Sequence, residues 1–177
     1  MYLTKFTNSY KELNDKLIKP VQGSNLYRIF TRPYMMQVHI YNNGNGNDKY
    51  IPCSMFHGIC AICESNNVPI PLWLIGVKTH NCCGTIAIHK KIFEHIQMLC
   101  RSPWGDPDQN DYLISFVWRS PNYIQCIPFL PEMISVKIDK PSKDVKLYYS
   151  QIMQNFSIPP TYEEIKEMFE KEKEIKK

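Results

Sequence analysis

Most of the residues that could hold a metal ion lie between positions 57 and 89. Cys60 and Cys63 form a C-x2-C pair, and His80 and Cys83 form an H-x2-C pair, with sixteen residues between the two pairs. A gap of two residues lets a tight turn aim two side chains at one ion, and two such pairs complete the tetrahedral ligand set of zinc. The spacing therefore predicts one zinc ion bound by Cys60, Cys63, His80 and Cys83.

Other donors nearby leave the ligand set open. Cys82 adjoins Cys83, His89 lies six residues beyond Cys83, and Cys53 and His57 lie upstream, so any of these four could replace one of the predicted ligands. The competing interpretation is that the cysteines fill a hydrophobic core, since cysteine is among the most buried residue types. Four protein ligands leave zinc no open position for water, so the predicted metal is structural.

The sequence contains none of the common catalytic motifs. It has no G-x-S-x-G elbow, no H-E-x-x-H helix and no Walker loop, and none of its five histidines has glutamate two residues later, as zinc deaminases require. Cys53 and His57 are the residue types of a Cys–His nucleophile, but the sequence does not show that a base is oriented to activate the cysteine. We therefore predict a non-enzymatic protein. A metal-dependent hydrolase would need an open coordination position with Glu or Asp nearby.

Basic residues gather in and after the cysteine region. Lys78, Lys90, Lys91 and Arg101 fall there, with two tryptophans close in sequence. Positive charges interleaved with aromatic rings are what phosphate contact and base stacking use. The competing interpretation is that the lysines are the solvated face of an amphipathic helix. We predict nucleic acid as the partner, and a zinc-stapled protein–protein interaction module as the alternative.

Length and composition are those of one compact domain. The chain has 177 residues, of which 44% are hydrophobic, enough for a sizeable core. The formal charge of +4 favours approach to a polyanion. Seven cysteines, an odd number, without an apolar signal peptide at the start, favour reduced thiols in the cytoplasm or nucleus. No run reaches the roughly 18 apolar residues of a membrane span, and we expect no membrane association.

Helices are predicted at three places. Residues 9–20 begin with a Ser-x-x-Glu capping box, and apolar residues recur at every third or fourth position over 85–100. A second capping box, Thr161 with Glu164, opens an amphipathic helix over 161–177, whose apolar stripe is an alternative partner-binding surface.

Strands are predicted where aromatic and β-branched residues concentrate, over 26–30, 35–41, 112–118, 123–127 and 133–138. Asn and Gly dominate 42–48, which predicts an exposed hairpin tip. The spacer between the metal-ligand pairs is long enough for two short strands that fold back. Together these elements predict an α+β fold, in which small antiparallel sheets and flanking N- and C-terminal helices surround a zinc-finger core, knuckle or treble-clef-like, over 53–100. We assign residues 1–177 to a single domain.

The C-A-I-C knuckle, the sixteen-residue spacer, the second cysteine-bearing turn at 80–84 and the helix and β segment that follow resemble one known family. It comprises the late transcription factors of poxviruses and African swine fever virus that carry an FCS-type zinc finger. The resemblance covers roughly residues 58–130. The family's Phe-Cys-Ser would fall at 81–83 or 82–84, and the expected closing cysteine three or four residues later is absent, which leaves the fourth ligand open.

The resemblance implies a virus-encoded late protein that acts with DNA and the viral RNA polymerase machinery in the cytoplasm or nucleus of a host cell. It also implies that Cys60, Cys63 and Cys83 are zinc ligands. In the alternative, the protein engages a host factor and zinc only staples its fold.

Overall fold

The computed structural model describes residues 13–42, 48–54, 58–120, 123–158 and 160–167. Residues 13–16 and 162–167 are helical. Between them the strands and helices are, in chain order, β1 (Gly23–Ile29), β2 (Tyr34–Asn42), β3 (Asp48–Pro52), α2 (Ala61–Glu64), β4 (Ile70–Lys78), β5 (Cys83–Ile88), α3 (Lys90–Cys100), β6 (Leu113–Ser120), β7 (Tyr123–Phe129) and α4 (Lys143–Ser157). The predicted α+β class and its antiparallel pairing are confirmed.

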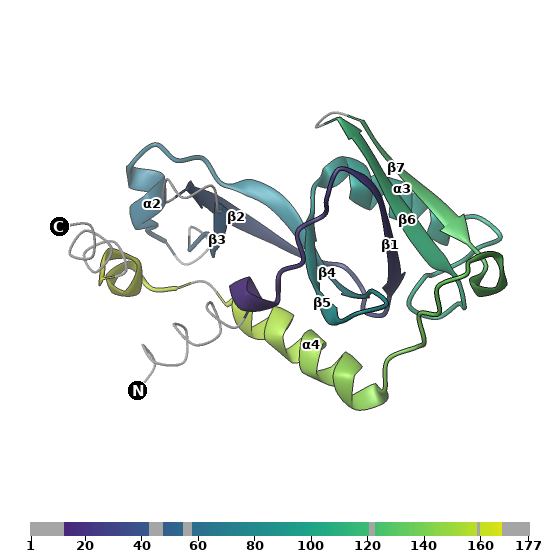
Figure 1. Ribbon diagram of the computed structural model, residues 1–177. Helices are drawn as coiled ribbons and strands as arrows, with labels where there is room; N and C mark the ends of the chain where they lie inside the picture. The colour runs from purple at the N-terminus through teal and green to yellow at the C-terminus, as the bar shows by residue number, and fades with distance from the viewer. Residues whose placement is uncertain (1–12, 43–47, 55–57, 121–122, 159, 168–177) are drawn as a thin grey trace.

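The seven strands form an antiparallel sheet organised around β4. The end of β1 and the first half of β2 pair along one edge of β4, and β5 pairs along the other. β3 extends the sheet beyond β2, while β6 and β7 extend it beyond β1. In Figure 1, α2, β2 and β3 occupy one end of the molecule, β6, β7 and α3 occupy the other, and β4 reaches from one to the other.

Both faces of β4 are apolar because each packs against a different core cluster. Successive side chains of a strand point to opposite faces, so a strand buried on both sides is a near-continuous apolar run. Leu72 and Leu74 belong to the α4 cluster, whose other buried members are Leu13, Met36, Val38, Ile51, Cys53, Cys60, Ile62, Ile152, Met153, Phe156 and Ile165. Ile75 and Val77 belong to the α3 cluster, whose other buried members are Tyr27, Ile29, Ile86, Ile88, Ile92, Ile96, Tyr112, Ile114 and Phe116.

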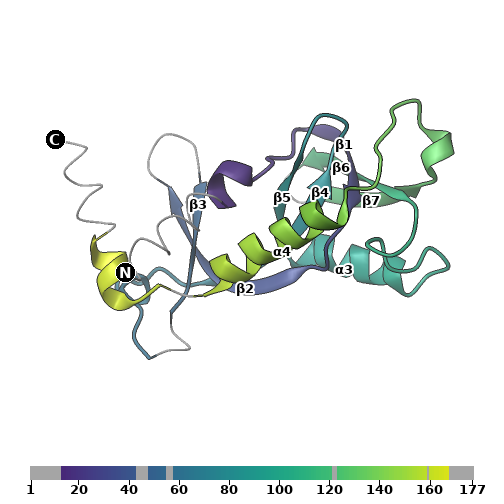
Figure 2. The ribbon, with the colours of Figure 1, turned by 90° about the horizontal axis from the view of Figure 1, so that it is seen from below.

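α4 was not among the predicted helices, although its sequence is amphipathic. Ser142 caps it by accepting a hydrogen bond from the backbone N–H of Val145 at 3.3 Å. Ile152, Met153 and Phe156 recur at helical spacing and are buried in the α4 cluster. Figure 2 shows α4 running along the sheet. Neither α4 nor another helix of the described ranges is long and apolar enough to cross a bilayer.

One predicted helix begins later than expected, and one predicted strand is wrong. Residues 85–88 belong to β5 rather than to a helix, because their backbone pairs with β4. The helix α3 begins only at Lys90. Residues 133–138 form no strand: a 3-10 turn, Pro131–Met133, precedes them, and the Ile138 carbonyl accepts a hydrogen bond from Arg28 Nε at 2.8 Å. That guanidinium also forms an ion pair with Asp111, and its hydrogen bond lowers the pKa of the carboxyl.

The two capping boxes have different outcomes. At the C-terminal one, Glu164 N–H donates to Thr161 Oγ1 at 3.3 Å and Thr161 N–H donates to Glu164 Oε2 at 2.8 Å, as predicted. Ile165 behind it is fully buried in the α4 cluster, so it does not contribute to a partner-binding stripe. The N-terminal box at Ser9, the hairpin tip over 43–47 and the last turns of the C-terminal helix lie outside the described residues.

Candidate metal centre

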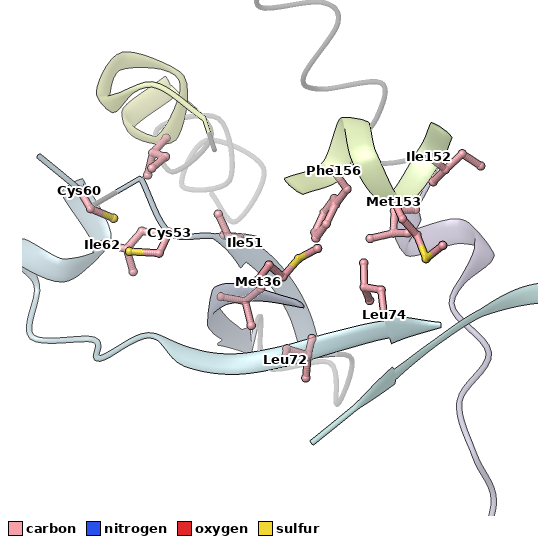
Figure 3. Packing of buried hydrophobic residues seen from close by; sticks show 13 residues of the cluster. Met36, Ile51, Cys53, Cys60, Ile62, Leu72, Leu74, Ile152, Met153 and Phe156 are labelled. Atoms are coloured by element: carbon pink, nitrogen blue, oxygen red, sulfur yellow. The ribbon is translucent and has the colours of Figure 1, made fainter. Parts of the chain in front are cut away.

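Four donor side chains from neighbouring segments converge beside the α4 cluster. His39 comes from β2, Cys53 follows β3, and Cys60 and Cys63 come from the start of α2. Their ligand atoms all lie within 4.8 Å of one another, and three of the four residues are buried while Cys63 is half-buried. In Figure 3, Cys53 and Cys60 lie at the end of the cluster that is remote from α4. The described residues contain no other such group of three or more His, Cys, Asp or Glu side chains.

The register of the β2–β3 hairpin brings His39 and Cys53 together. His39 pairs with Ile51, and residues opposite each other in an antiparallel ladder share a face. Cys53 is two residues beyond Ile51 and therefore points to the same face as His39. Its backbone N–H donates to the Gln37 carbonyl at 2.8 Å, which extends the pairing past the end of β3.

Residues 58–63, together with Ser54, form a knuckle around the Cys60 sulfur. Ser54 Oγ donates to the Ile59 carbonyl at 3.1 Å and closes the turn, after which Cys60 is the residue that precedes α2. Burial raises the pKa of the Cys60 thiol, but hydrogen bonds from the backbone of Cys63, Ser54 and Ile62 outweigh it and lower the pKa to about 6. The backbone therefore favours a thiolate, which is the form that binds metals.

The distances between the donors are those of a tetrahedral zinc site. The sulfurs of Cys53 and Cys63 are 3.6 Å apart, and His39 Nε2 lies 3.4 Å from the Cys60 sulfur and 3.6 Å from the Cys63 sulfur. Zinc–sulfur bonds of about 2.3 Å and zinc–nitrogen bonds of about 2.0 Å place tetrahedral ligands about 3.8 Å (S···S) and 3.5 Å (S···N) apart. All the cysteines concerned are free thiols. A Cys3His set of this size fits zinc.

The Cys63 thiol lies where a cation would be stabilising. Burial raises its pKa, and the neighbouring sulfurs of Cys53 and Cys60 raise it further, to about 12. Two thiolates this close repel each other, and a divalent ion between them offsets that repulsion.

Asn67 contacts the ring nitrogen of His39 that does not face the sulfurs. Its Oδ1 lies 3.4 Å from His39 Nδ1, and its Nδ2 donates to the Ile40 carbonyl at 3.4 Å. Because an amide oxygen can only accept a hydrogen bond, this contact favours the tautomer that carries its hydrogen on Nδ1 and its lone pair on Nε2, the nitrogen that faces the sulfurs. Metal-binding histidines commonly have such an outer partner.

Replacing Asn67 with alanine is expected to lower zinc affinity about 10- to 100-fold, because the imidazole loses its tautomer and orientation. Competition with a chromophoric chelator measures the affinity. Asn81→Ala, in the exposed β4–β5 turn, is the matched control and should leave the affinity unchanged. Equal affinities of the two variants would show that Asn67 has no orienting role.

Of the four ligands predicted from the sequence, the structure brings together Cys60 and Cys63 only. Cys83 pairs with Lys78 at the far end of β4 from Ile70, and eight strand residues at about 3.3 Å each separate those ends by about 26 Å. The spacer forms one long strand rather than two short ones that fold back. His80 lies exposed in the turn that follows and is outside the cluster.

Of the alternative ligands predicted from the sequence, one belongs to the cluster and two do not. Cys53 is a member of the cluster. Cys82 is exposed in the β4–β5 turn and His89 precedes α3, both outside the cluster, and His57 lies outside the described residues. His39 was missed, although a signal for it existed. A hairpin centred in the Asn/Gly tip at residue 45 pairs residue 39 with residue 51, and thus places His39 on the face of Cys53.

The predicted nucleic-acid-binding residues lie on two elements. Lys90 and Lys91 are exposed on the first turn of α3, and Arg101 is exposed directly after its last turn. Lys90 Nζ lies 3.8 Å from Glu94 Oε1, an exposed pair of the kind that contributes little to stability. Lys78 stands apart from them, at the end of β4.

The chain matches no protein-family model, no curated protein and no solved structure.

Proposed function

We propose that His39, Cys53, Cys60 and Cys63 bind one structural zinc ion, in a non-enzymatic protein that binds nucleic acid. The observation that carries the zinc proposal is the mutual distance of four donors, one nitrogen and three sulfurs, within 4.8 Å. With four protein ligands the ion has no open position for water, so its role is to hold the fold.

The zinc adds a link between α2 and the β2–β3 hairpin, which also meet through the buried Ile62 and Ile51 of the α4 cluster. α2 is only four residues long, and isolated helices of that length are not stable. Two of the ligands, Cys53 and Cys60, are also members of the α4 cluster. The ion therefore fixes α2 and the β2–β3 hairpin to the rest of the core, and its binding free energy adds to that of folding.

The strand order supports nucleic acid as the partner. Leaving β2 and β3 aside, the sheet runs β5-β4-β1-β6-β7, with α3 between the third and fourth of these strands in chain order. We infer that these elements form an OB-like, partly open five-stranded Greek-key barrel, into which the β2–β3 hairpin and the metal centre are inserted. OB-folds bind single-stranded nucleic acid with a positively charged groove and aromatic side chains. This topology favours single strands over duplexes as the bound nucleic acid.

Charge reversal at Lys90 and Lys91 tests the nucleic-acid partner. We expect Lys90→Glu with Lys91→Glu to weaken binding of a fluorescein-labelled dT oligonucleotide on the order of tenfold. The slope of log K against log salt should also fall by about 0.7 for each phosphate that the protein no longer neutralises. Fluorescence anisotropy at several salt concentrations measures both. Lys143→Glu with Lys146→Glu on α4 is the control. Unchanged affinity of the α3 variant at unchanged zinc content would contradict the proposal.

The competing function is a protein-interaction module, and one observation favours it. Met98 on α3 is 68% exposed and lines a cavity of about 430 Å³ together with His95, Trp104 and Ile127. An apolar protein interface changes little with salt, whereas nucleic-acid binding weakens steeply. The same salt titration therefore separates the two functions.

A role in viral late transcription stays a prediction that rests on the sequence resemblance. Of the ligands that the resemblance implies, Cys60 and Cys63 belong to the Cys3His cluster and Cys83 does not.

A further inference from the structure

A second cavity, of about 480 Å³, opens between the β1–β2 junction, α3 and the turn at 106–107. Its volume lies within the range of about 300–1,000 Å³ that is typical of small-ligand sites. We propose that this cavity, "the Arg32 pocket", holds one nucleotide of a bound single strand, with Arg32 and Arg101 at its phosphate. The proposal rests on the proposed nucleic-acid function and names the site where a nucleotide is held.

The β1–β2 junction gives the pocket a fixed wall. Gly76 N–H donates to Thr31 Oγ1 at 2.7 Å, and the Gly76 carbonyl accepts from Phe30 N–H at 3.0 Å. A Cβ at Gly76 would lie 2.7 Å from the Thr31 methyl and 2.8 Å from the Phe30 ring, so only glycine admits this close packing. Arg32 therefore projects from a segment that is anchored on β4 at the preceding residue.

The two arginines that line the pocket come from different elements. Arg32 follows Thr31 on the junction, and Arg101 follows the last turn of α3. Both are exposed, and neither forms an ion pair with a carboxylate of the described residues. Two guanidiniums on one cavity suit a phosphate, whose oxygens accept bidentate hydrogen bonds.

Asp106 is the one carboxyl that lines the pocket among the residues that the structure describes. Its hydrogen bond with Asp108 and its partial burial raise its pKa, while the charge of Arg32 acts in the opposite direction. Even with Asp106 ionised, the two arginines leave the pocket a net positive charge.

The remaining residues that line the pocket suit a nucleobase. Ile29, Phe93, Ile96 and Pro107 give an apolar lining. The Phe93 ring is held in place by stacking on Trp73, with centroids 4.5 Å apart and an interplanar angle of 12°. Apolar and aromatic walls beside a phosphate site are the combination that single-strand-binding proteins use without sequence preference.

A further cation, Lys90, lies on the same face of α3, where it forms an exposed ion pair with Glu94. Lys90, Gln97 and Arg101 recur at helical spacing, so Lys90 stands on the stripe that lines the pocket. Eleven residues at 1.5 Å each put Lys90 about 16 Å from Arg101 along the helix. A strand anchored in the pocket has a second phosphate contact at that end of α3.

The test uses the full-length zinc-loaded chain with fluorescein-labelled oligo-dT and oligo-U. Arg32→Gln with Arg101→Gln removes the charges, and Gln97→Trp fills the cavity while both guanidiniums remain. We expect each variant to lose affinity on the order of tenfold for one or both oligonucleotides, at unchanged zinc content and circular dichroism. Lys143→Gln with Lys146→Gln removes the same charge from α4, which packs on the opposite face of β4, and should keep wild-type affinity.

The outcomes separate the pocket from the function on which it rests. If the wild-type chain binds neither oligonucleotide, the nucleic-acid function and the pocket both fail. If it binds and the Lys90/Lys91 variant weakens, but the arginine variant or the folded Gln97→Trp variant keeps wild-type affinity, only the pocket is overturned. Loss with oligo-dT alone or oligo-U alone supports the pocket and identifies DNA or RNA as the strand.

Discussion

Replacing Cys60 with serine is expected to abolish stoichiometric zinc binding and to unfold the part of the molecule built on α2 and the β2–β3 hairpin. Apparent binding free energies of structural zinc reach about 10–16 kcal/mol in small zinc domains, comparable to the whole stability of a typical protein, about 5–15 kcal/mol. Elemental analysis of zinc per chain and thermal unfolding of the same samples measure the two effects.

Cys83→Ser is the matched control, because Cys83 lies outside the cluster. It should keep its zinc and its unfolding transition, whereas Cys53→Ser should behave like Cys60→Ser. If Cys83→Ser lost the metal while Cys53→Ser retained it, the ligand set predicted from the C-x2-C and H-x2-C pairs would be right and the Cys3His cluster would not bind zinc.

Truncating Phe156 to alanine is expected to cost about 3–5 kcal/mol of stability, the second-largest effect. Phe156 is fully buried and extends from α4 into the cluster that β2 and β4 form (Figure 3). The missing ring leaves a cavity where α4 packs on the sheet. Urea unfolding of the zinc-loaded protein measures the loss as a shift of the midpoint.

Leu147→Ala on the same helix is the control, since Leu147 is 58% exposed. Its stability should stay within about 0.5 kcal/mol of the wild type. A Phe156→Ala protein as stable as Leu147→Ala would mean that α4 does not form part of the core.

Local patterns in the sequence located the elements better than they located the site. The strands that became β1, β2, β6 and β7 were predicted because their aromatic and branched residues concentrate in short runs. Residues 85–88 were misassigned because Ile88 continues the helical period of Ile92 and Ile96, while Ile86 and Ile88 also satisfy the alternation of a strand. That ambiguity was resolved by tertiary pairing with β4.

The metal centre was predicted only in its local half. Cys60 and Cys63 are recognisable because two residues separate them, and no tertiary information is needed. The other half depends on whether residues 64–79 fold back or extend. Residues 70–78 extend as one long strand, which carries Cys83 away, while the pairing of β2 with β3 places His39 and Cys53 at the knuckle. Such non-local pairings cannot be read from ligand spacing alone.

Zinc K-edge X-ray absorption of the purified full-length protein tests the central claim most directly. We predict one zinc per chain, with three sulfurs at about 2.3 Å and one nitrogen at about 2.0–2.1 Å bound directly to it. A set of oxygen and nitrogen ligands, or a protein that takes up no zinc, would contradict a Cys3His centre at His39, Cys53, Cys60 and Cys63.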